Sequence, residues 1–218
     1  GRDLVNKILD FDNQEISSHT FSHFYCKSKA ATKELFLDDL KRSIHVASDL
    51  DISFESIVFP RNQVNLDFFD ILREHNITIF RGNLNKLLYK YGHEAPAGVI
   101  GRTLRLADTW LPFTQNLSFN PSINSKLLNI PGSIFLRPYS NNLRFLDHLK
   151  IIRIKNQMLR AARNNKVFHL WWHPHNFGIN LHKNLAILED ILRYYQTLND
   201  KYNMVSSNMK NFNKNKFT

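Results

Sequence analysis

The sequence predicts an α/β fold with parallel strands. Runs rich in Ile, Val and Phe recur along the chain, and segments in which apolar residues repeat every three or four positions separate most of them. This alternation is typical of strands that helices join into a parallel sheet. A chain of 218 residues that is 43% hydrophobic can bury one sizeable core. Its length favours one domain, or a compact (β/α) barrel of the roughly 250-residue class.

Five short segments carry the expected strands. Each contains β-branched or aromatic residues, which fit a pleated and partly buried surface. The segments are residues 15–18, 56–60, 77–81, 133–137 and 167–172.

Four longer segments carry the expected helices. Their apolar residues recur at helical spacing, so each segment presents one face to a core. The segments are residues 31–48, 65–75, 140–164 and 183–198.

Two regions lack a regular pattern. Residues 82–132 contain several Gly, Pro, Asn and Ser residues, and we expect an irregular insertion across the barrel mouth there. Residues 204–218 are rich in Asn and Lys, which predicts a flexible tail. The expected organisation is therefore a single domain over residues 1–203, followed by that tail.

Composition excludes several classes of protein. Cys26 is the single cysteine, so an intrachain disulfide and a thiolate zinc cluster are both excluded. No run of 18 apolar residues occurs, so no membrane span is expected, and the sequence does not open with a signal peptide. We expect a cytoplasmic location, with the inner face of the membrane as the alternative.

The net charge of +10 raises the question of nucleic acid. The cations are scattered along the chain, however, and no nucleic-acid-binding motif accompanies them. We therefore expect no nucleic-acid partner. A generic basic surface, facing an anionic glycan, a diphosphate-linked lipid or a membrane, is the favoured interpretation.

Two histidines follow the first expected strand at a spacing of four. If Ser18 caps a helix beginning beside His19, then His19 and His23 project from one face. Neutral imidazole is the commonest metal ligand, so the pair is a candidate metal site. The alternative is two unconnected surface or core histidines.

Residues 15–23 resemble the His-Ser/Thr-x-x-His metal motif of the polysaccharide deacetylase family, carbohydrate esterase family 4. Two later segments fit the same family pattern in order and separation: Phe59-Pro60-Arg61-Asn62-Gln63 resembles its arginine motif, and residues 167–174 resemble its late Leu-x-His motif. Residues 105–108, 135–139 and 171–178 are similar to a bacterial surface-polysaccharide branch, which serves O-antigen or capsule synthesis. The resemblance implies a distorted (β/α) barrel and a metal-dependent sugar N-deacetylase.

One departure from the family is serious. The family's first motif is an Asp-Asp pair that supplies a metal ligand and the general base, and no such pair precedes His19 here. Asp10 and Asp12 are the nearest aspartates before His19, and they read as a helix end and a turn. We expect the sequence to be a fragment that lacks the first barrel strand. Its open strand edge makes a homodimer one expectation.

The resemblance also implies roles for the remaining residues. His19 and His23 would hold a divalent metal, zinc by default, together with a carboxylate. His173 would be the general acid, and Arg61 would hold the general base in its ionised form. The alternatives are a packed structural imidazole for His173 and a surface salt bridge for Arg61.

Three further residues are candidates for binding an N-acetylated sugar or polysaccharide. Trp110 and Tyr139 could stack on a sugar ring or fill the core, and His175 could face the substrate or be structural. A rival hypothesis is a non-catalytic descendant that keeps the deacetylase-like domain and binds a glycan or a biosynthetic partner. The missing Asp-Asp pair motivates it.

Overall fold

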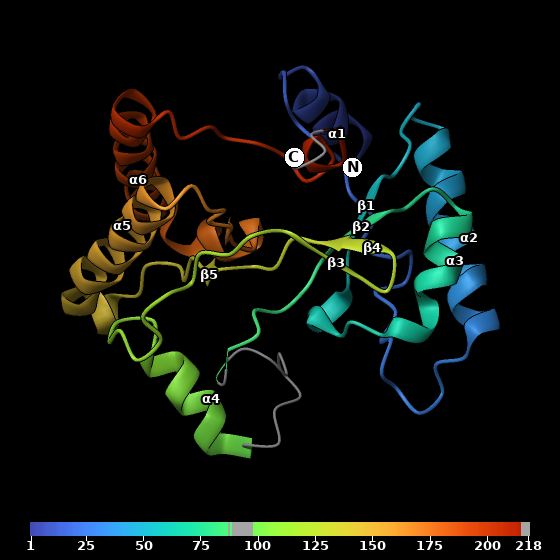
Figure 1. Cartoon of the computed structure of the whole chain (residues 1–218), viewed down its shortest axis with the longest axis horizontal. Helices are drawn as coiled ribbons and strands as arrows, with labels where there is room; N and C mark the ends of the chain where they lie inside the picture. Colours follow the sequence, from blue (N-terminus) through green and yellow to red (C-terminus); the bar gives the residue numbers. More distant parts are fainter. Residues whose placement is uncertain (87, 89–97, 215–218) are drawn as a thin grey trace. The chain divides into compact units, whose positions relative to one another are not determined.

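The computed structural model describes residues 1–86, 88 and 98–214, and these form a mixed α/β structure (Figure 1). The chain divides into two compact units. Unit 1 comprises Gly1–Gly82, Pro121–Ile130 and Ser206–Thr218, and unit 2 comprises Asn83–Asn120 and Pro131–Val205.

Unit 1 contains a four-stranded sheet. Its order is β1 (Ser56–Val58), β2 (Ile79–Arg81), β4 (Leu127–Asn129) and β3 (Ser122–Asn124). β2 pairs parallel with both β1 and β4, whereas β3 is antiparallel to β4. Ser18 adds one parallel bridge to Ile57 of β1. One edge of the sheet therefore contains the carboxyl ends of β1, β2 and β4, together with Ser18. We call it the carboxyl edge.

The helices of unit 1 are α1 (Arg2–Leu9), α2 (Lys33–Ser48), α3 (Phe69–Glu74) and α7 (Asn211–Lys214), with 3₁₀ turns η1 (Pro60–Asn62) and η2 (Leu66–Phe68). α2 begins where Thr32 caps it, because the Thr32 hydroxyl accepts a hydrogen bond from the Leu35 amide at 3.3 Å. Figure 1 shows α2 and α3 beside the sheet.

Phenylalanines form the centre of the unit 1 core. Phe36 of α2 stacks on Phe68 at 4.3 Å between ring centroids, and Phe69 of α3 lies 4.8 Å from Phe80 of β2. All four side chains are almost completely buried. Burying one such ring contributes roughly 1.5–3 kcal/mol, so these contacts fix the two helices to the sheet.

The segment leading to α7 is held against unit 1 by hydrogen bonds. The Asn208 side chain donates to the Asn13 carbonyl at 3.0 Å, and the Lys210 amide donates to the Glu15 carboxylate at 2.9 Å. The Asn213 side chain donates to the Thr78 hydroxyl at 2.8 Å. Polar contacts therefore join this part of the expected tail to the rest of unit 1, and its flexibility stays a prediction. Residues 215–218 lie outside the described residues.

Unit 2 contains α4 (Gly98–Ala107), β5 (Ile134–Phe135), η4 (Asn141–Leu146), α5 (Asp147–Arg163), β6 (Leu170–Trp171), η5 (Pro174–Asn180) and α6 (Leu181–Tyr202). β5 and β6 form a two-stranded parallel sheet. The helices α5 and α6 lie side by side (Figure 1), and they bury Ile154, Met158, Ile191 and Leu198 between apolar neighbours.

One face of α5 carries buried polar side chains. Arg153 forms an ion pair with Asp108 at 2.7 Å, and both side chains are almost fully buried. Arg153 also donates to the Leu111 carbonyl at 2.8 Å, and Gln157 binds the Leu117 amide at 2.9 Å. These contacts hold the loop that follows α4 against α5.

The parallel strands and the four predicted helices are confirmed, with boundaries shifted by a few residues. Of the strand expected over residues 15–18, Ser18 alone pairs with the sheet. The range 82–132 contains α4, β3 and β4, so it contributes to the sheet of unit 1 rather than being irregular throughout. β3 reads Ser-Ile-Asn and is exposed, so the apolar runs that mark the equally short β1 and β2 are missing there. Residues 87 and 89–97 of that range lie outside the described residues.

The described strands form two separate sheets, and the closed barrel stays a prediction. In the part of the chain that the structure describes, no helix is both long enough and apolar enough to cross a bilayer.

Candidate functional site

His19 lies at the carboxyl edge, directly after Ser18. Its Nδ1 atom is 2.6 Å from the carbonyl oxygen of Val58, the last residue of β1. A carbonyl oxygen can only accept, so Nδ1 carries the proton and the lone pair of the neutral ring is on Nε2. A histidine that binds a metal usually donates its other ring N–H to a carboxylate, a backbone carbonyl or water, and the Val58 carbonyl is such a partner.

His23 lies next to His19, with 5.1 Å between ring centroids and an interplanar angle of 68°. The predicted helix that would bring them together is absent, because residues 19–30 form turns and loop. Thr20 has a φ of 64° and His23 a φ of 56°. Left-handed backbone at a β-branched residue such as Thr20 is unusual and strained, and such strain clusters at functional sites.

Asp39 holds this strained loop in place. It lies on the buried face of α2 and accepts hydrogen bonds from the amides of Phe21 at 2.8 Å and Ser22 at 2.9 Å, and from the Ser22 hydroxyl. A charged acceptor strengthens each of these bonds. The helix α2, which follows the loop in sequence, therefore holds the loop in place.

Tyr25 and Arg61 continue the line of side chains. The His23 and Tyr25 ring centroids are 5.5 Å apart, and the Arg61 guanidinium carbon lies 4.2 Å from the Tyr25 centroid. His19, His23, Tyr25 and Arg61 therefore form a continuous row, which we call the edge row. Its first, second and fourth members are residues that the sequence singled out.

Arg61 follows β1, as predicted. Both Arg61 and Asn62 have a φ of 55°, so the backbone turns sharply beyond the strand. The Asn62 side chain accepts a hydrogen bond from Arg81, the last residue of β2, at 2.9 Å. Burial of the Arg81 guanidinium lowers its pKa to about 10, so it stays charged at neutral pH. Two arginines of neighbouring strands thus lie at the same edge.

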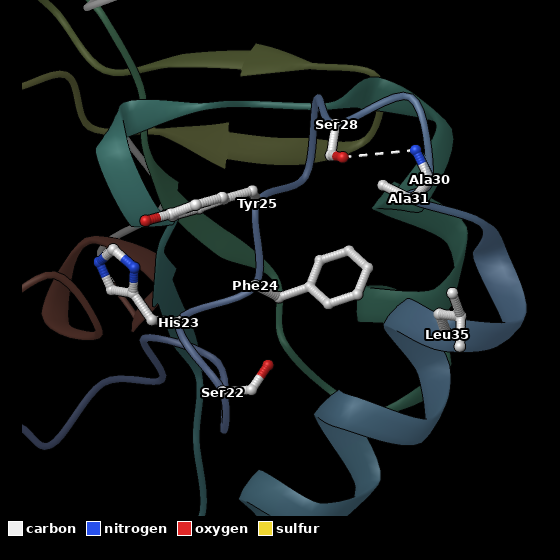
Figure 2. Close-up of a pocket in the computed structure, with 8 residues that line it drawn as sticks. All are labelled: Ser22, His23, Phe24, Tyr25, Ser28, Ala30, Ala31 and Leu35. Carbon is white, nitrogen blue, oxygen red and sulfur yellow. Dashed lines mark hydrogen bonds between the residues drawn. The ribbon is translucent and has the colours of Figure 1, made fainter.

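A pocket of about 450 Å³ adjoins the edge row. Figure 2 shows the loop from Ser22 to Ala31 on one side and Leu35 of α2 on the other. His23 and Tyr25 belong to both the pocket and the row. The remaining wall mixes hydroxyl groups with apolar side chains: Ser22, Ser28, Phe24, Ala30, Ala31 and Leu35.

The described residues supply two candidate metal ligands but no third. Nowhere among them do three His, Cys, Asp or Glu side chains gather closely enough to hold a metal ion. Asp10 and Asp12 are exposed around the end of α1, and Glu15 instead accepts hydrogen bonds from Ser56 and from the Lys210 amide.

His173 lies in unit 2, just beyond the end of β6, as predicted. Its ring is 5.5 Å from Phe135, 5.7 Å from Trp171 and 5.3 Å from His175, with which it stacks. Phe135 and Trp171 are themselves 4.6 Å apart across the β5–β6 pair. The structure therefore brings His173 and His175 together in an aromatic cluster.

Tyr139 and Trp110 lie elsewhere in unit 2. The Tyr139 amide donates to the buried Asn184 side chain at 2.6 Å, and its hydroxyl accepts from Lys183 at 3.0 Å. Trp110 is half-buried in the turn after α4. These residues belong to a different unit from the edge row, and the structure does not relate the two units.

Sequence reasoning missed Asp39 and Tyr25. Asp39 could have been noticed as a carboxylate three positions after Phe36 on the buried face of an amphipathic helix. Tyr25 carries no comparable signal, because its role depends on the turn that brings Arg61 onto its ring.

Comparison with family models, curated proteins and solved structures found no match for the chain. The resemblance to the polysaccharide deacetylase family rests on its motifs alone.

Proposed function

We propose that the protein is a metal-dependent N-deacetylase of amino sugars, acting in bacterial surface-polysaccharide synthesis. The observation that carries the proposal is the pairing of His19 with His23 at 5.1 Å, at the carboxyl edge of a parallel sheet. Enzymes with parallel sheets place their active sites at this edge. By the same resemblance, we propose that the fold is a distorted (β/α) barrel, and that the reaction takes place in the cytoplasm or at the inner face of the membrane.

His19 and His23 would hold the metal, with His19 oriented by the Val58 carbonyl. Zinc or a similar divalent ion would polarise the amide carbonyl and acidify water. A third ligand and the general base are not among the described residues of this group. The resemblance assigns both to an Asp-Asp pair ahead of the histidine motif, and no such pair precedes His19 in the sequence.

His173 would donate a proton to the amine that leaves, and Trp110, Tyr139 and His175 would contact the sugar. These roles rest on the resemblance and on the position of His173 after a parallel strand. The resemblance also has Arg61 hold the general base. In the structure, Arg61 contacts the Tyr25 ring.

A second candidate function is a non-catalytic module that binds a glycan or a partner protein. The lack of a third ligand within the described residues favours it. In this case the edge row and its pocket would bind a ligand without hydrolysing it.

Acetate release distinguishes the two functions. The full chain is loaded with zinc and incubated with N-acetylated amino sugars as monosaccharide, oligosaccharide and nucleotide-linked forms. The proposal predicts acetate release that His19→Ala abolishes and that His45→Ala, a surface histidine of α2, leaves unchanged. Sugar binding with no acetate from any of the three forms would establish the binding module instead.

A further inference from the structure

The carboxyl edge of unit 1 carries two arginines. Arg61 follows β1, and Arg81 is the last residue of β2. The Asp39 carboxylate, which binds the loop of the edge row, already accepts hydrogen bonds from three donors. Such a surface attracts multiply charged anions.

Arg61 is the cation best placed to bind one. Its side chain is exposed and lies over the Tyr25 ring, and within the described residues its guanidinium forms no hydrogen bond or ion pair. Stacking on an aromatic face leaves the N–H groups in the guanidinium plane pointing sideways. That fork of donors matches phosphate and carboxylate oxygens.

The backbone conformation at residues 61–62 also holds Arg61 in a fixed position. Arg61 and Asn62 both adopt left-handed conformations, and Asn62 is tied to Arg81 of the next strand. Non-glycine residues persist in that conformation only when their surroundings hold them there. The edge therefore presents the Arg61 fork at a defined place beside the imidazole pair.

We propose that the ligand of the carboxyl edge carries a phosphate or diphosphate group, and that Arg61, which lies over the Tyr25 ring, binds it. The uncharged sugar would then occupy the pocket beside His23. This inference shares its site with the proposed function and narrows its substrate to phosphate-linked amino sugars, whether the diphosphate joins a nucleoside or a lipid. It does not require that the sugar be hydrolysed.

Calorimetric titration of the full chain with inorganic pyrophosphate tests the inference. The protein is first stripped of metal on a chelating resin, so that metal binding cannot contribute. At about 0.15 M salt, where long-range attraction is largely screened, Arg61→Ala should weaken binding about tenfold or more. Arg61→Lys keeps the charge but loses the fork of donors. Its affinity for pyrophosphate should therefore lie between those of the wild type and Arg61→Ala.

Arg42→Ala is the matched control, because Arg42 is an exposed arginine of unit 1 that pairs with Asp38 on α2. It should change the affinity by no more than about threefold. Equal losses in Arg61→Ala and Arg42→Ala would overturn the inference, since binding would then depend on total charge alone. Undetectable binding of pyrophosphate to the wild type would also overturn it. Unfolding curves of each variant show whether the fold is retained.

Two further arms identify the source of the phosphate. One uses a soluble nucleoside diphosphate N-acetylamino sugar, and the other uses vesicles containing a polyprenyl diphosphate N-acetylamino sugar. The probe whose binding depends on Arg61 identifies the carrier of the phosphate group. If neither does, or if the free uncharged sugar binds equally well, the inference fails. Loss of metal binding or of acetate release would leave these results unaffected, so the two proposals fail separately.

Discussion

Asp39 binds Ser22 twice, through the backbone amide at 2.9 Å and through the hydroxyl group. This contact fixes the turn between His19 and His23 to α2. The geometry of the candidate site therefore depends on a residue that touches no ligand and lies 16 positions further along the chain than His23.

Replacing Asp39 tests that dependence. Asp39→Ala removes an acceptor for three donors, and hydrogen bonds to a charged group contribute about 1.5–3 kcal/mol each. Allowing for water that replaces part of the loss, we expect the free energy of unfolding in urea to fall by about 2–4 kcal/mol.

The matched control for this variant is Asp38→Ala. Asp38 is the neighbouring carboxylate on α2 and forms an exposed ion pair with Arg42 at 3.0 Å. Such pairs contribute about 0–1 kcal/mol, so the change should be small. Similar losses in the two variants would show that Asp39 contributes only general helix stability.

Arg153 is expected to be essential for the stability of unit 2. Arg153→Ala leaves the buried Asp108 carboxylate without its ion pair, and breaking a buried pair in this way costs about 3–5 kcal/mol. The control is Arg163→Ala, at an exposed arginine of the same helix that contacts the Tyr202 hydroxyl. It should change the free energy of unfolding by no more than about 0.5 kcal/mol. Thermal unfolding of both variants measures the difference. Arg153→Ala with wild-type stability would contradict the structural role that we assign to Asp108.

The buried thiol of Cys26 predicts a dependence of stability on pH. Burial, aided by the charge of Asp39, raises the pKa of Cys26 from 9.0 to about 12. Between those values the unfolded thiol loses its proton while the folded thiol keeps it. The stabilisation is therefore complete below pH 9 and is lost as the pH rises towards 12, by about 1.4 kcal/mol per pH unit within that window.

Urea unfolding at pH 8 and pH 10 of the wild type and of Cys26→Ala checks this, because other titrating groups cancel in the comparison. The wild type should lose more stability than the variant between the two values. The native thiol should also react slowly with a disulfide reagent at pH 8. Equal pH dependence, or rapid modification of the native protein, would show that Cys26 is not buried.

The sequence predicts the long elements of this fold well. Residues 33–48 and 181–202 carry enough helical turns for their apolar spacing to be distinctive. The β3–β4 hairpin escaped prediction because β3 is exposed and reads Ser-Ile-Asn, so it lacks the apolar run that marks β1 and β2, which are equally short. Its turn is built by left-handed Ser125 and Lys126, which are not typical turn residues for that conformation.

The candidate site, like the fold, was predicted only in part. Position after a strand correctly placed Arg61, and the spacing of His19 and His23 correctly indicated that the rings are neighbours. The reason for their proximity was wrong, because a loop rather than a helix brings them together. That loop is specified by Asp39 and by the backbone of Thr20, which are non-local and conformational features that a local pattern does not contain.

The most direct test of the proposed metal site is the zinc content and zinc affinity of this chain, produced without a histidine tag. The wild type is compared with the double variant His19→Ala, His23→Ala and with the control His45→Ala, His75→Ala, which removes two other histidines of unit 1. We expect about one zinc per chain in the wild type and control, and none in the His19/His23 variant. No zinc in any of the three proteins, or equal zinc in all of them, would contradict a metal site at the edge row.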